Sequence, residues 1–118
     1  MSLTRQEVMK VVNRYIGVSG GYLGDFSYRT HAEFYPEYCG LDIEPNTYPG
    51  TTRERFIEIL STRSPYEQAK ILRGVIDRFG DDADHPNRSP LRPELEGWIA
   101  RLEGAPAVEL DTPGRPET

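Results

Sequence analysis

The stretch "TTRERFIEILSTRSPYEQAKILRGVIDRFG", residues 51–80, predicts two consecutive helices. "TTRE" and "SPYE" are capping boxes, in which a hydroxyl-bearing residue stands three positions before a glutamate. In such a box the hydroxyl accepts a hydrogen bond from an early backbone N–H, and the glutamate reaches back to the cap residue. Apolar residues then recur at helical spacing, namely Phe56, Ile57, Ile59 and Leu60, followed by Ala69, Leu72, Ile76 and Phe79. The stretch therefore predicts a pair of amphipathic helices.

Two more helices are predicted on either side of this pair. "TRQE" opens a third capping box at Thr4, its apolar residues extend to Ile16, and Gly17 is a natural stop. A last helix is expected over residues 93–102, ended by Gly104, with Trp98 in the core. No run of β-branched residues alternates with period two. The predicted fold class is all-α, a compact bundle of about five helices over residues 1–103, followed by a proline-rich tail or linker at 104–118.

Composition excludes several classes of function. The net charge of −5 and the presence of only two lysines make nucleic acid an improbable partner, because phosphate backbones are bound by clustered cations. No apolar run approaches the roughly 20 residues that span a bilayer, so no membrane association is expected. The single cysteine, Cys39, offers no internal disulfide. A soluble, cytoplasmic protein without cofactor or metal is expected.

The segment between the first and third predicted helices is rich in glycine and aromatic residues. "YIGVSGGYLGDFSYRTHAEFYPEYCG", residues 15–40, holds five of the seven tyrosines. A short helix is expected over residues 27–35 and is limited by Pro36, because proline clashes with the carbonyl four residues back. The glycine-rich part lacks the lysine of a phosphate-binding loop and follows a helix, so we expect an irregular segment.

Two groups of residues are candidates for catalysis. Asp25, His31 and Glu33 form one group, although Glu33 also stands at ion-pair spacing from Arg29. The other group is Arg78 with His85, whose spacing matches that of HEPN-type ribonucleases. The acidic "DDAD" between them would repel an RNA phosphate. A structural role is the favoured interpretation of both groups, and no metal-ligand spacing is present.

Residues 3–79, which include "YIGVSGGYLGDFSYRTHAEFYPEYCGLDIEPNTYPGTTRERFIEIL" and "SPYEQAKILRGVIDRF", resemble a small helical domain at the amino terminus of AbiJ-type abortive-infection proteins. The resemblance implies an accessory module of a bacterial anti-phage defence system, one that senses, recruits or assembles. It carries over no catalytic residue. No effector domain follows residue 79, so we expect either an excised domain or a protein that docks onto an effector on another chain.

We therefore expect a non-enzymatic protein-interaction, sensor or adaptor module with a protein partner, either an effector or another copy. The expected contact surface consists of Tyr22, Phe26, Tyr28, Arg29, His31 and Tyr35. The alternatives are a small ribonuclease or other hydrolase, and a small-ligand sensor whose pocket lies under residues 20–28. An exposed aromatic surface would favour the interaction module over catalysis, since tyrosine, tryptophan and arginine dominate interface hot spots.

Overall fold

The computed structural model describes residues 2–19, 22–80, 86 and 88–108. Within these residues the chain is mostly helical, which confirms the all-α prediction. The α-helices are α1 (Arg5–Lys10), α2 (Tyr28–Phe34), α3 (Thr52–Thr62), α4 (Pro65–Arg78) and α5 (Arg88–Val108). Two π-helical segments, η1 (Val11–Ile16) and η2 (Tyr35–Cys39), continue α1 and α2, and η3 (Pro45–Thr47) is a short 3₁₀ turn. No helix in the described part is long and apolar enough to cross a membrane.

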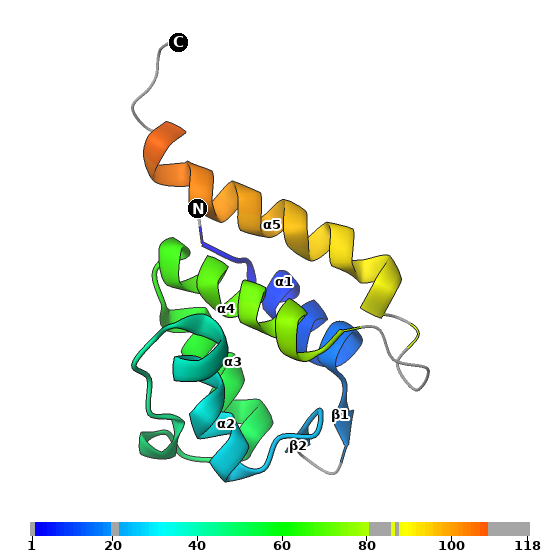
Figure 1. The fold of residues 1–118 in the computed structure, drawn as a ribbon, viewed down its shortest axis with the longest axis vertical. Coiled ribbons are helices and arrows are strands. Elements are labelled where there is room, and N and C mark those ends of the chain that lie inside the picture. Colours follow the sequence, from blue (N-terminus) through cyan, green and yellow to red (C-terminus); the bar gives the residue numbers. More distant parts are fainter. Residues whose placement is uncertain (1, 20–21, 81–85, 87, 109–118) are drawn as a thin grey trace.

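Helix α4 lies at the centre of the bundle (Figure 1). Helix α5 crosses one side of it and also packs on η1, while α2, η2 and α3 lie on the other side. The position of α4 explains why its buried residues extend almost all round it: Gln68, Ala69, Ile71, Leu72, Gly74 and Val75. A helix that packs on two layers needs this broad apolar surface.

The capping signals at Thr4 and Thr51 are confirmed. At Thr51 the side-chain oxygen accepts from the N–H of Glu54 at 3.2 Å, and the Glu54 carboxylate accepts from the N–H of Thr51 at 2.9 Å. The box at Thr4 is equivalent. Ser64 accepts from the N–H of Glu67 at 3.3 Å. Three of the helix starts were therefore specified by local sequence.

The structure differs from the predictions at three places. Pro36 does not end its helix; the chain continues through it as η2 to Gly40, whose φ of 67° closes the segment. The wider π-helical winding avoids the proline clash with the carbonyl four residues back. Where an irregular segment was expected, β1 (Val18–Ser19) and β2 (Tyr22–Leu23) pair as two short antiparallel strands. Helix α5 starts at Arg88 rather than at residue 93 and runs past Gly104 to Val108.

Gly74 allows η2 to approach α4 closely. A Cβ at this buried position would lie 2.6 Å from Sγ of Cys39 and 3.1 Å from the carbonyl oxygen of Tyr38. Cys39 is itself buried, and burial raises the pKa of its thiol to about 12. The missing side chain of Gly74 therefore sets the distance between these two elements.

We expect Gly74→Ala to destabilise the protein by about 1–3 kcal/mol, because the added methyl group must displace η2. Alanine is otherwise the better helix former by about 1 kcal/mol. Gly97→Ala on the exposed side of α5 is the matched control, since a Cβ added there has nothing within 4 Å. This variant should stabilise the protein. Urea unfolding followed by circular dichroism measures both. Equal stability of the two variants would contradict this account of Gly74.

Candidate interaction surface

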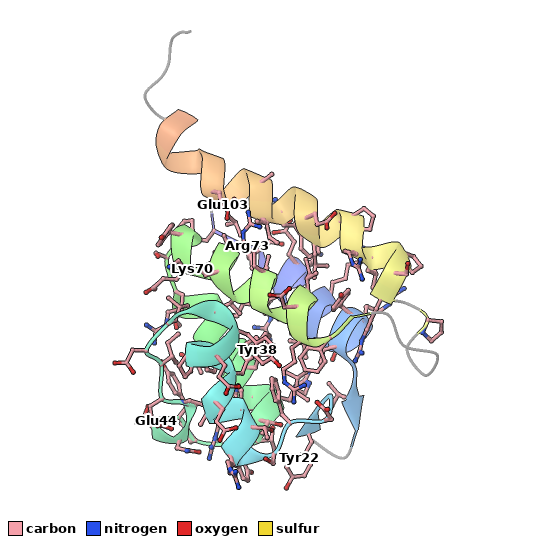
Figure 2. The ribbon with its side chains drawn as sticks, viewed as in Figure 1. Tyr22, Tyr38, Glu44, Lys70, Arg73 and Glu103 are labelled. Carbon is pink, nitrogen blue, oxygen red and sulfur yellow. The ribbon has the colours of Figure 1, made fainter. Side chains whose placement is uncertain are left out.

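The structure separates the expected contact surface into a buried part and an exposed part. Phe26, His31 and Tyr35 are at most 3% exposed, so their assignment to a contact surface is wrong. For two of them the cause is the helical period: His31 on α2 and Tyr35 at the start of η2 are four residues apart in one continuous helical run, so both face the core. Tyr22 and Tyr28 remain 46% and 42% exposed. In Figure 2, Tyr22 lies at the outer edge of the molecule.

His31 belongs to an aromatic cluster beneath this surface. Its ring centroid lies 5.0 Å from that of Phe26 and 5.2 Å from that of Tyr35, and Nε2 is 2.7 Å from the Tyr35 hydroxyl oxygen. Burial, and to a smaller extent the nearby Arg55 guanidinium, lower the pKa of His31 to about 4, so the ring is neutral at pH 7. Nδ1 has no hydrogen-bond partner among the described residues. The histidine is therefore a core residue rather than an accessible base.

The exposed Tyr22 and Tyr28 lie beside a partly buried residue that was not expected here, Arg55; we call these three residues the tyrosine–arginine surface. The ring centroids of the two tyrosines are 6.0 Å apart, and the Arg55 guanidinium lies 4.4 Å from the centroid of the Tyr28 ring. The Nη1 group of Arg55 also donates a hydrogen bond of 2.9 Å to Oδ1 of Asn46. Arg29, beside Tyr28 in the first turn of α2, is exposed as predicted and pairs with Glu33 at 3.4 Å. Contacts on both sides thus hold the Arg55 side chain in place.

Three elements hold the two tyrosines in position. The N–H of Leu23 donates to Oγ1 of the buried Thr52 at 2.9 Å, which ties β2 to the start of α3. Because successive strand residues face opposite sides, burying Leu23 turns Tyr22 outward. Ser27 caps α2 and accepts from the N–H of Thr30 at 3.1 Å, which places Tyr28 in the first helical turn.

Sequence reasoning missed Arg55. The letters "TRER" place it within the first turns of a capped helix, but nothing near it in the sequence indicates stacking on Tyr28. Tyr28 and Arg55 are 27 positions apart in the sequence, and their contact depends on how α2 and α3 pack. The sequence indicated that the two tyrosines could belong to a hot spot. The third residue of the surface, Arg55, is recognised only from the tertiary structure.

The residues considered for catalysis have separate partners. Asp25 pairs with Arg78 at 3.2 Å, whereas Glu33 pairs with Arg29 and His31 bonds to Tyr35. The Arg78 guanidinium also lies 4.9 Å and 5.1 Å from two phenylalanine rings, those of Phe26 and Phe79. It therefore covers the edge of the core. His85 lies outside the described residues, and no metal-binding group of three ligands occurs within them.

Two hollows on the described surface lie away from the glycine-rich segment. One, of about 530 Å³, is lined by Tyr48, Pro49, Gly50, Glu54 and Glu58. The other is an open groove along α1 and η1 that includes Arg5 and Arg14. Neither is the pocket under residues 20–28 that the ligand-sensor alternative expects. Trp98, expected in the core, is only partly buried and packs against its edge.

Comparisons with protein-family models, with curated proteins and with solved structures find no match to this chain. The tyrosine–arginine surface is therefore assessed by its own chemistry. Aromatic faces, phenol hydroxyls and guanidinium N–H groups provide stacking and hydrogen bonding. These are the properties of a binding surface.

Proposed function

We propose that the protein is a non-enzymatic interaction module, an adaptor or sensor of a bacterial anti-phage defence system, which recruits or regulates a separate effector protein. Its contact site is the tyrosine–arginine surface, extended by Arg29. The defence role is supported by the resemblance of residues 3–79 to AbiJ-type abortive-infection proteins.

The observation that carries the proposal is the fixed geometry of half-exposed hot-spot residues. The Tyr28 ring lies beside both Tyr22 and Arg55, and the helix that carries it also carries His31 of the buried aromatic cluster. Tyrosine and arginine are enriched among residues that dominate binding energy. Because these side chains are already ordered, little rotamer entropy is lost on association. A surface of this kind suits protein recognition better than catalysis.

We expect the double variant Tyr22→Ala/Tyr28→Ala to weaken effector binding at least 30-fold, which corresponds to about 2 kcal/mol. The probes are the purified products of the genes beside this one, tested by calorimetry. Circular dichroism should show unchanged helix content, because both tyrosines are half exposed. Tyr66→Ala is the matched control: Tyr66 is 60% exposed on α4 and should be dispensable.

Two results would overturn the proposal. One is binding of a neighbouring gene product that survives the double variant unchanged. The other is the absence of binding by any neighbouring product to the unmodified protein. If the double variant unfolds, the single variants Tyr22→Phe and Tyr28→Phe, which remove only the hydroxyls, provide the test instead.

A further inference from the structure

Arg55 carries a positive charge that its surroundings do not neutralise. Within the described residues no carboxylate lies within 4.0 Å of its guanidinium. Its hydrogen bond goes to the neutral amide of Asn46, and its buried Nε has no acceptor there. By contrast, Arg73 and Arg101 each bind a glutamate through two hydrogen bonds.

The location of Arg55 makes this charge unfavourable in the isolated protein. It is the fourth residue of α3, near the helix end that carries a positive partial charge. It also lies close enough to the buried His31 ring to lower its pKa. A half-buried cation in such a place is stabilised by an anion. The side chain is nevertheless held in one position by Tyr28 and Asn46.

We propose that Arg55 binds an aspartate or glutamate side chain from an acidic segment of the partner protein, and this inference rests on the proposed function. The guanidinium has five N–H donors in a planar fork, and one of its nitrogens is engaged by Asn46. Because Nε is buried, a partner carboxylate would accept from the Nη1 and Nη2 edge of the fork, through the N–H groups that Asn46 does not use. The half-exposed ring of Tyr28, on which the guanidinium lies, borders this edge.

A carboxylate fits this site better than a phosphate does. Proteins generally hold phosphorylated segments with clusters of arginines. Here the neighbouring Arg29 is already paired with Glu33, which leaves Arg55 as a single fork.

The test is an NMR titration of the full chain with the peptide acetyl-Glu-Glu-Glu-amide at low salt. We expect saturable shifts of the Arg55 Nε–H signal and of the Tyr28 amide, with millimolar affinity that weakens as sodium chloride is added. Acetyl-Gln-Gln-Gln-amide should produce no such shifts. Arg55→Gln should weaken binding at least ten-fold, whereas Arg53→Gln, two residues earlier on the same helix, should retain it.

The inference is overturned if Arg55→Gln binds the glutamate peptide as well as the unmodified protein, or if the glutamine peptide binds equally. It is also overturned if inorganic phosphate shifts these signals and the glutamate peptide does not. Suppose that Arg55→Gln binds a neighbouring gene product fully, whereas the tyrosine double variant loses that binding. This result would refute the role of Arg55 and leave the proposed function intact. Undiminished binding by the double variant would refute the proposed function.

Discussion

Replacing Arg88 with methionine should lower the free energy of unfolding by about 3 kcal/mol, because buried carbonyl groups lose their donors. Arg88 is 5% exposed. Its Nε donates to the carbonyl oxygen of Tyr15 and its Nη2 to that of Ile16, both at 3.0 Å. These carbonyls end η1, where no further helical N–H is available to them. The guanidinium also lies 5.1 Å from the ring centroid of Phe79.

Arg88→Met keeps the apolar stem, so the expected loss reflects hydrogen bonds rather than packing. Removing the buried charge also removes its desolvation cost, which keeps the effect from being larger. Arg73→Met is the matched control. Arg73 lies on α4 and binds Glu103 on α5 (Figure 2), but the pair is exposed and should contribute less than about 1 kcal/mol. Urea unfolding at pH 7 compares the variants; equal losses would show that Arg88 does not anchor α5.

Helix positions were predictable wherever the decisive interactions are local. The box between Thr51 and Glu54 spans three residues, and its two hydrogen bonds are present in the structure. The same holds for Thr4. In these cases the sequence signal and the stabilising contact involve the same few residues.

The features that sequence reasoning missed depend on contacts between distant residues. Arg88 stands in the polar string "NRSP", which gives no sign of burial, and its acceptors are 72 and 73 positions away. These bonds attach the first turn of α5 to the end of η1. The burial of His31 also depends on tertiary packing, because either face of a short helix with mixed residues could have faced the core.

Acidification should reveal the buried histidine as a stability effect. Through His31 alone, we expect acidification from pH 7 to pH 5 to lower the free energy of unfolding by about 2 kcal/mol. Its pKa is lowered from 6.5 to about 4 in the folded protein, mainly by burial and additionally by Arg55, whereas the unfolded chain has the ordinary value. Between these two values the unfolded state binds more protons. Stability therefore rises with pH through this window and levels off above it.

The comparison is between the unmodified protein and His31→Gln, with unfolding free energies measured by urea titration at pH 7, 6 and 5. The variant should lose about 2 kcal/mol less over this range, since it has no group to protonate at this site. The carboxylates of Glu7 and Glu103, whose pKa values are lowered by Arg101 and Arg73, are present in both proteins. Their contribution is lost only at lower pH, so it does not obscure the difference. Parallel pH profiles would mean that water reaches His31 and that the aromatic cluster is open; diverging profiles would identify a closed cluster that supports the tyrosines above it.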